Sequence, residues 1–329
     1  MMRSGEAPIL SSGSLANYTR PSASPIIPQT TLDDVDRDLK LFPNVQFDYS
    51  TVPKTLLKPW QVFEDIKILG RGAFGEVHLV RNKSDGKLFA LKYLLNPNPD
   101  MLDIEIGSLR EISGYPNCEE NIVCYYDAFQ FRDKDGSIKY GVLMEYISGE
   151  SLEKFIETHT IEPELLSKMA LWLTTVLADL HAQGFTHRDI KPGNIMVTET
   201  AQLKLIDFGL TCTNREPDSK APTCGEGIAG TAGYLPPDIT RAQFSQDKVG
   251  HLQAADIFAA GVTLYNMANM MRDPYQLNNN LHITGNIRPS DYDYPCFNNI
   301  VYQMLNPDYK QRPTAAEANF MFQECILPY

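Results

Sequence analysis

The chain has 329 residues, a formal net charge of −12 and 43% hydrophobic residues. This length and apolar content suffice for one large domain or two lobes with a buried core, so no stabilising disulfide or metal is needed. The acidic excess gives no electrostatic reason to expect nucleic acid or an anionic membrane as a partner. Composition therefore predicts an ordinary globular protein and argues against a nucleic-acid-binding one.

The cysteines and the first residues indicate the compartment. The six cysteines form no CxxC pair and have no histidine at zinc-finger spacing, which predicts free thiols, a reducing compartment and no structural disulfide. The opening stretch MMRSGEAPIL lacks the apolar core of a secretory signal, and no apolar run nears membrane-spanning length. We therefore expect a cytoplasmic protein without a membrane anchor, with the nucleus as the alternative location.

Residues 1–58 are rich in Ser, Thr and Pro, a composition that disfavours a packed core and predicts a flexible arm. One stretch differs, because Leu32, Val35 and Leu39 share a helical face behind a candidate cap at Thr31. One interpretation is that this stretch docks on the domain or on a partner. The alternative is that it forms only a weak, transient helix.

Residues 59–147 predict a small β-rich lobe. The runs FEDIKIL, VHLVRN and KLFALKYLL alternate with glycine-containing turns, which is typical of an antiparallel meander. The stretch MLDIEIGSLREI has its apolar residues at helical spacing, and NIVCYYDAFQF and KYGVLMEYI are again strand-like. We therefore expect five strands and one helix.

Residues 148–329 predict a larger, mainly helical lobe. Helical spacing recurs in SLEKFIETH, in PELLSKMALWLTTVLADLHAQG, in QAADIFAAGVTLYNMANMM and in TAAEANFMFQECI, while IMVTET and LKLIDFG are short strands. The two parts together predict an α+β fold of two lobes, with a cleft where the lobes meet.

The glycine-rich stretch GRGAFGEV is a candidate phosphate-binding loop. A dinucleotide-binding fold, which carries similar letters, requires a helix after the glycines, whereas here the strand-like EVHLVRN follows. The context therefore favours a loop that folds over phosphates within a hairpin. Glycines allow backbone N–H groups to approach the anion closely, because no Cβ intervenes.

Lys92 lies inside the otherwise apolar strand FALK and therefore calls for a charged partner. Glu105 on the following helix is the preferred partner, with Glu111 as its rival nearer the helix end. The alternative is that the ammonium group reaches solvent beyond its apolar stem.

Nine stretches occur in the order and approximate spacing of eukaryotic-type serine/threonine protein kinases, which the chain resembles over about residues 63–325. They are GRGAFGEV, FALK, Glu105, LMEYISGESL, HRDIKPGN, DFG, GTAGYLPPD, DIFAAG and QRPT. The resemblance implies the two-lobed protein kinase fold, with a small β-rich N-lobe containing one key helix and a larger α-helical C-lobe. It also implies ATP- and Mg²⁺-dependent phosphoryl transfer to Ser or Thr hydroxyls of protein substrates.

The resemblance also assigns site residues. Asp189 would orient the substrate hydroxyl or act as its base, and Lys191 would offset charge on the transferred phosphate; as alternatives, both are solvated surface charges. Asn194 and Asp207 would bind Mg²⁺, or, if unrelated to metal, cap turns. Lys92, held by Glu105, would bind phosphates. The implied ATP-binding set is Gly70, Arg71, Gly72, Ala73, Phe74, Gly75, Val77, Ala90, Lys92, Met144, Glu145, Ile147 and Met196.

The polar segment between Asp207 and Asp238 resembles an activation segment. By resemblance, Arg188 would bind a phosphate on this segment and so order it. The available acceptor hydroxyls are Thr211, Thr213, Ser219 and Thr223. The alternative is a plain loop that happens to be rich in Ser and Thr.

Two positions depart from the family pattern. The usual APE is here Pro236-Pro237-Asp238, and Phe258 replaces the usual Trp. Asp238 could still pair with Arg312, but its side chain is one methylene shorter than that of Glu, so the anchoring of the substrate-binding segment is open. Asp256 would bind the backbone of the catalytic loop.

By resemblance to the family, Thr231 together with Lys191 implies serine/threonine specificity. Three alternatives to a serine/threonine protein kinase stand beside this prediction: a pseudokinase scaffold, a kinase of small molecules, and a tyrosine or dual-specificity kinase. Every assigned catalytic position carries a competent residue, which argues against the pseudokinase.

Overall fold

The structure is a computed structural model that describes residues 58–72, 75–94, 99–114, 117–133, 136–213, 224, 228–241, 248–269 and 293–326. The expected arm, with its helical stretch near Leu32, therefore lies outside the described residues apart from Lys58. Four expected site residues also lie outside them: Ala73, Phe74, Ser219 and Thr223. For Glu105 the backbone is described and the side chain is not.

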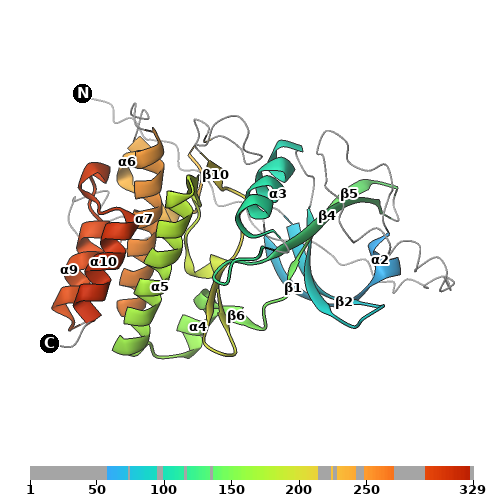
Figure 1. The fold of residues 1–329 in the computed structure, drawn as a ribbon, viewed down its shortest axis with the longest axis horizontal. Coiled ribbons are helices and arrows are strands. Elements are labelled where there is room, and N and C mark those ends of the chain that lie inside the picture. Colours follow the sequence, from blue (N-terminus) through green and yellow to red (C-terminus); the bar gives the residue numbers. More distant parts are fainter. Residues whose placement is uncertain are drawn as a thin grey trace, which may run out of the picture.

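The N-lobe is a five-stranded antiparallel sheet with strand order β1-β2-β3-β5-β4 (Figure 1). Its strands are β1 (Phe63–Gly72), β2 (Gly75–Asn82), β3 (Leu88–Leu94), β4 (Tyr125–Arg132) and β5 (Ile138–Glu145). One long helix, α3 (Pro99–Ser113), lies between β3 and β4 in the chain, and a short helix, α2 (Pro59–Val62), precedes β1. The five strands and the long helix confirm the prediction; α2 was not predicted.

The apolar spacing of α3 explains its packing. Ile106, Leu109 and Ile112 recur at helical intervals and are 2%, 0% and 3% exposed. They belong to the main core, together with β3 and β5 residues. Because α3 packs between the sheet and the C-lobe, its position depends on both lobes.

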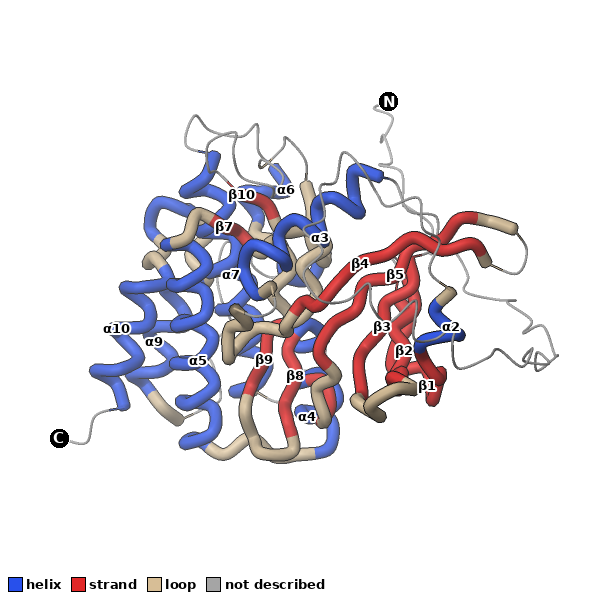
Figure 2. The backbone as a smooth tube through the Cα atoms, turned by 45° about the vertical axis from the view of Figure 1, so that its right-hand side comes forward, coloured by secondary structure: helices blue, strands red, loops and turns tan. Residues whose placement is uncertain are grey.

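The C-lobe consists mainly of helices, and α5, α9 and α10 lie side by side in it (Figure 2). Its helices are α4 (Leu152–Thr158), α5 (Pro163–Ala182), α6 (Pro237–Arg241), α7 (Lys248–Ala268), α9 (Pro295–Met304) and α10 (Ala315–Ile326). Short strands lie towards the N-lobe: β6 (Gly149–Ser151), β8 (Ile195–Thr198) and β9 (Leu203–Leu205) form one sheet, and β7 (Phe185–Thr186) pairs with β10 (Cys212–Thr213). Three single-turn helices are η2 (Pro192–Asn194), η3 (Ala232–Tyr234) and η4 (Tyr309–Gln311).

A backbone junction fixes one lobe against the other. The amide of Val123, just before β4, donates to the carbonyl of Leu205 in β9 at 3.0 Å, and the amide of Leu205 donates to the carbonyl of Asn121 at 2.8 Å. The main core runs through this junction without interruption, from Ile106 in α3 to Leu177 in α5. The site between the lobes therefore has a defined geometry.

The expectation of free cysteines was wrong. The structure pairs all six as Cys118–Cys124, Cys212–Cys224 and Cys296–Cys325. Their Cα atoms lie 5.1, 4.9 and 5.9 Å apart, within the reach of a disulfide. These pairs, whose members are 6, 12 and 29 residues apart, match neither the CxxC nor the zinc-finger spacing on which the expectation rested.

Candidate active site

The loop His187–Asn194 connects β7 to β8, and Asp256 of α7 holds its start. The backbone amides of His187 and Arg188 each donate to one carboxylate oxygen of Asp256 at 2.8 Å. His181 donates to the same carboxylate at 3.0 Å. Arg188 has φ +69°, a conformation that costs a non-glycine residue about 1 to 3 kcal/mol unless its surroundings hold it. The buried Asp256 supplies that support, as the sequence predicted, and so fixes the loop that carries Asp189.

Asp189 is the centre of a hydrogen-bond network. Its Oδ1 accepts from the backbone amide of Thr231 at 3.0 Å and from the Thr231 hydroxyl at 2.7 Å. Its Oδ2 accepts from Lys191 Nζ at 2.7 Å and from Asn194 Nδ2 at 2.9 Å. Lys191 also donates to the Thr231 hydroxyl at 2.7 Å. The network joins the loop, through side chains, to residues 230–238, which we call the substrate-side segment.

The same contacts set the ionisation of Asp189. Burial opposes the charged form, but hydrogen bonds from Lys191 and Thr231, together with the Lys191 charge, outweigh it and hold the pKa of Asp189 below its usual range. The carboxyl group is therefore ionised at neutral pH. An ionised carboxylate next to an ammonium group and a hydroxyl can orient a second hydroxyl and accept its proton.

Lys92 of β3 meets Asp207, the aspartate of DFG, across the two lobes. Lys92 Nζ lies 3.3 Å from Asp207 Oδ1, and the Lys92 side chain is 9% exposed against 34% for Asp207. Asp207 has φ +64°, which again marks a strained backbone at the site. Phe208, the next residue, is fully buried and meets the His187 ring edge-on with centroids 4.9 Å apart. Burial of Phe208 thus keeps Asp207 beside Lys92.

The buried histidine between these loops is neutral. Burial lowers the pKa of His187, against the opposing effect of Asp256, Asp189 and Asp207. Its Nδ1 accepts from the backbone amide of Asp189 at 3.2 Å. His187 therefore braces the loop as an apolar and hydrogen-bonding residue, with no charge of its own.

The residues expected around the adenine lie on β2, β3, β5 and β8 and on the segment that connects the two lobes after β5. We call this segment, with Glu145 at its start, the connecting segment. Ala90 of β3 is the register partner of Met144 in β5, and both are 8% exposed. Val77 packs against the main core from β2, and Met196 is half-buried on β8. Ile147 follows β5 and also packs against the core. The main core thus includes Ala90 and Met144 and is contacted by Val77 and Ile147, while Met196 lies on the small sheet of β6, β8 and β9.

The glycine-rich loop lies at the β1–β2 turn. Gly70 pairs with Val77 and Gly72 with Gly75 across the two strands. A Cβ on Gly75 would lie 2.1 Å from the carbonyl oxygen of Tyr93, so no other residue fits there. Arg71 makes an exposed ion pair with Glu76 at 3.0 Å.

Glu145 does more than the sequence indicated. Its carboxylate accepts from Lys204 of β9 at 2.8 Å and from the backbone amide of Cys124 at 3.2 Å. The connecting segment is therefore tied to both lobes. The sequence held no signal for this contact, because Lys204 lies on a separate strand.

The substrate-side segment is anchored at Asp238. Arg312 Nη2 donates to Asp238 Oδ1, so the pair that the sequence left open forms despite the shorter side chain. Nε2 of His251 lies 2.6 Å from the other oxygen, Oδ2. The role of His251 was missed, because nothing near this residue in the sequence marks it.

Two of the expected phosphate acceptors are inaccessible in this conformation. Thr211 and Thr213 are each 1% exposed. The Thr213 hydroxyl donates to the carbonyl of Gly184 at 3.1 Å, and Thr213 belongs to β10. Arg188 is half-buried, and burial lowers its pKa against the opposing charge of Asp256.

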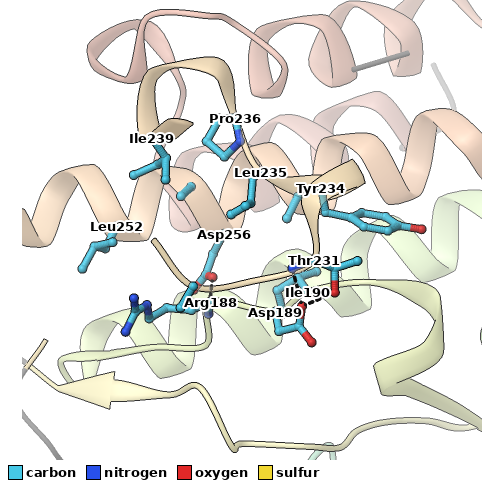
Figure 3. A pocket seen from close by; sticks show the side chains of 13 residues that line it. Arg188, Asp189, Ile190, Thr231, Tyr234, Leu235, Pro236, Ile239, Leu252 and Asp256 are labelled. Carbon is cyan, nitrogen blue, oxygen red and sulfur yellow. Dashed lines mark hydrogen bonds between the residues drawn. The ribbon is translucent and has the colours of Figure 1, made fainter. Parts of the chain in front are cut away.

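A pocket lies beside Asp189, between the loop that carries it and helices α6 and α7. Figure 3 shows Asp189 and Thr231 facing one another, with the Arg188 side chain directed away from them. Apolar side chains line much of the pocket, among them Leu235, Ile239 and Leu252. The lining therefore joins the catalytic loop to α6 and α7.

Fold and site together define a protein with the two-lobed protein kinase fold. A family model described as the protein kinase domain matches residues 63–321, and the chain belongs to this family.

Several curated proteins are similar to the chain. Rho-associated protein kinase let-502 of Caenorhabditis briggsae is 32% identical over 209 residues, which are 62% of this chain and 16% of that protein. Serine/threonine-protein kinase 4 homolog B of Dictyostelium discoideum is 31% identical over 226 residues, 68% of this chain and 19% of that protein. "Probable serine/threonine-protein kinase nek2" of the same organism is 27% identical over 275 residues, which are 78% of this chain and 61% of that protein. The shared part is thus a fraction of each relative.

Proposed function

We propose that the chain transfers the γ-phosphate of ATP to serine and threonine hydroxyls of protein substrates. The contact of Thr231 with both Asp189 and Lys191 carries this proposal, because it joins the substrate-side segment to the two charged groups of the loop. Asp189 orients the acceptor hydroxyl and takes its proton, while Lys191 offsets charge on the moving phosphoryl group. The names of two relatives, both serine/threonine-protein kinases, support the choice of acceptor.

The nucleotide would occupy the cleft beneath the glycine-rich loop. Lys92, paired with Glu105, would bind the α- and β-phosphates, and the backbone of residues 70–75 would cover the triphosphate. The adenine would lie between the apolar side chains of Val77 and Ala90 above and Met196 below, with Met144 at the back. Backbone groups of Glu145 and Ile147 would bind its edge.

Asn194 and Asp207 would hold Mg²⁺. The residues fit this ion, since an amide oxygen and a carboxylate are the hard ligands that it prefers. Asn194 uses its Nδ2 on Asp189, so its Oδ1 is the atom that can bind a cation. When bound, the ion neutralises charge on the nucleotide phosphates.

Regulation would act through the segment after Asp207. A phosphate there would bind Arg188 bidentately and order the segment. Because Thr211 and Thr213 are buried, Ser219 and Thr223 are the better candidates among the expected acceptors. Phosphosite mapping of active protein tests this, and a bare segment would contradict it.

Residues 59–147 would form the N-lobe and residues 148–329 the C-lobe, with the arm 1–58 available to dock a partner. We expect a cytoplasmic or nuclear location. No helix among the described residues is long and apolar enough to cross a membrane.

The test of the function uses the full chain with labelled ATP, Mg²⁺ and a mixed protein panel. Asp189→Asn and Asp207→Asn variants should lose labelling, whereas Asp179→Asn, which changes an exposed carboxylate on α5, should retain it. Equal labelling by all four proteins would refute the assigned site, and phosphotyrosine alone would refute the specificity. ATP binding without any labelling would favour the pseudokinase.

A further inference from the structure

Asp238 is held from two sides by residues of separate elements. Arg312, which follows η4, donates to Oδ1, and His251 of α7 donates to Oδ2 at 2.6 Å. His251 is 3% exposed and Arg312 is 6% exposed, so the contacts are shielded from water. Short charge-assisted hydrogen bonds in such surroundings are stronger than exposed ones.

Neither partner of Asp238 is able to move easily. Arg312 also donates to the backbone carbonyls of Asn306 at 2.7 Å and Ala254 at 3.1 Å. The imidazole of His251 stacks on the ring of Tyr309 with centroids 4.1 Å apart and planes inclined by 14°. Because both donors are fixed by other contacts, Asp238 has to be brought to them.

Asp238 in turn fixes the segment that carries Thr231. Between the two residues lies only the short helix η3 and the turn after it. Leu235 and Ile239, on either side of Asp238 in the chain, line the pocket together with Leu252, the neighbour of His251 (Figure 3). A shift of Asp238 would therefore reach the pocket and the contact of Thr231 with Asp189.

We propose that His251 is a positioning residue for phosphoryl transfer to protein substrates. It completes a clamp of His251, Asp238 and Arg312, in which the second donor compensates for the short side chain of Asp238. The proposal rests on the proposed function, because the reaction it serves is transfer to a protein. The clamp acts on the substrate side, and ATP binding in the cleft does not depend on it.

The experiment measures KM for ATP, KM for a protein substrate and kcat in the full chain. His251→Leu removes the donor and should lower kcat/KM for the protein substrate about tenfold, the effect of losing one buried charge-assisted hydrogen bond, while KM for ATP stays within about twofold. His251→Gln keeps an N–H donor at the end of the side chain and should recover most of the loss. His159→Leu, which alters an exposed histidine at the end of α4, is the matched control.

A double variant is the sharper test. Asp238→Glu lengthens the side chain by one methylene. In combination with His251→Leu, the longer carboxylate should stay bonded to Arg312 without a second donor and restore kcat/KM to within about threefold of the wild type. Should His251→Leu fail to fold by circular dichroism, the double variant is expected to fold. A double variant as impaired as His251→Leu would overturn the proposal.

Two further results would overturn the clamp: a His251→Leu enzyme with unchanged kinetics, or equal increases in KM for ATP and for protein. A wild type that labels no protein would refute the proposed function instead. Thermal melting of the same variants then tests the clamp by itself, because His251→Leu should melt below both the wild type and the double variant. Equal melting temperatures would contradict it.

Discussion

Thr231 donates its backbone amide and its hydroxyl to the same oxygen of Asp189, at 3.0 and 2.7 Å. Two donors from one residue fix both the distance and the orientation of that carboxylate. Thr231 belongs to the substrate-side segment and Asp189 to the catalytic loop, so the geometry of the reacting carboxylate depends on the placement of the segment. A displacement of this segment should therefore change the position of the Asp189 carboxylate.

The Thr231 hydroxyl should be required for the rate of transfer. Thr231→Val keeps the shape of the side chain but removes the donor to Asp189 and the acceptor for Lys191, so we expect kcat to fall about 10- to 100-fold. Thr231→Ser restores the hydroxyl and should recover most of the activity. Steady-state kinetics on a protein substrate check this, and a Thr231→Val enzyme with wild-type kcat would show that the contact is incidental.

Lys191 should set the acid limb of the pH profile. Hydrogen bonds from Lys191 and Thr231 keep the pKa of Asp189 low against burial, so Lys191→Met should raise it. Activity that needs the carboxylate is lost as the pH falls through that pKa, and the acid limb of kcat/KM should therefore move to higher pH. Lys168→Met, on the exposed face of α5, is the control. An acid limb that stays in place would contradict this role of Lys191.

Gly230 should tolerate no side chain. Its φ is +126°, and a Cβ would lie 2.7 Å from the carbonyl oxygen of Arg188. Gly230→Ala should therefore displace Thr231 and lower kcat at least about tenfold, with nucleotide affinity preserved. Gly136→Ala is a matched control, because Gly136 also has positive φ, +85°, but has open space around its Cβ. Equal activity of the two variants would refute the close approach as the cause.

Asp127 on β4 should make stability depend on pH. Burial raises its pKa to about 7, although the amide of Ala128 and the charge of Arg110 oppose the shift. A raised pKa means that the folded state holds the proton more tightly, so stability falls as the pH rises from about 4, the unfolded value, to about 7. Asp127→Asn should raise the melting temperature at pH 8 more than at pH 5. An equal change at both pH values would contradict the assignment.

Much of the fold followed from local patterns. The strand runs before residue 147 and the helical spacing of Ile106, Leu109 and Ile112 depend on neighbours in the chain, which a sequence displays. The catalytic loop and DFG were recognisable because the chemistry of phosphoryl transfer requires those residue types in one order.

The rest of the site depends on contacts between distant segments. The Cys296–Cys325 pair, the Glu145–Lys204 contact and the position of His251 beside Asp238 each join separate elements. The burial of Thr211 and Thr213 likewise follows from the pairing of β10 with β7. No spacing rule along the chain expresses such contacts, because they arise only when the lobes have folded.

Single-turnover transfer of labelled phosphate from ATP to a protein substrate, compared between the wild type and Asp189→Asn, tests the central claim most directly. The two enzymes should bind ATP equally well, because Asp189 faces Thr231 and Lys191 rather than Lys92. The variant should transfer phosphate about 10²- to 10⁴-fold more slowly, with the label on serine or threonine in the wild-type reaction. Equal rates for the two enzymes would contradict the assignment of Asp189 as the residue that orients and deprotonates the acceptor hydroxyl.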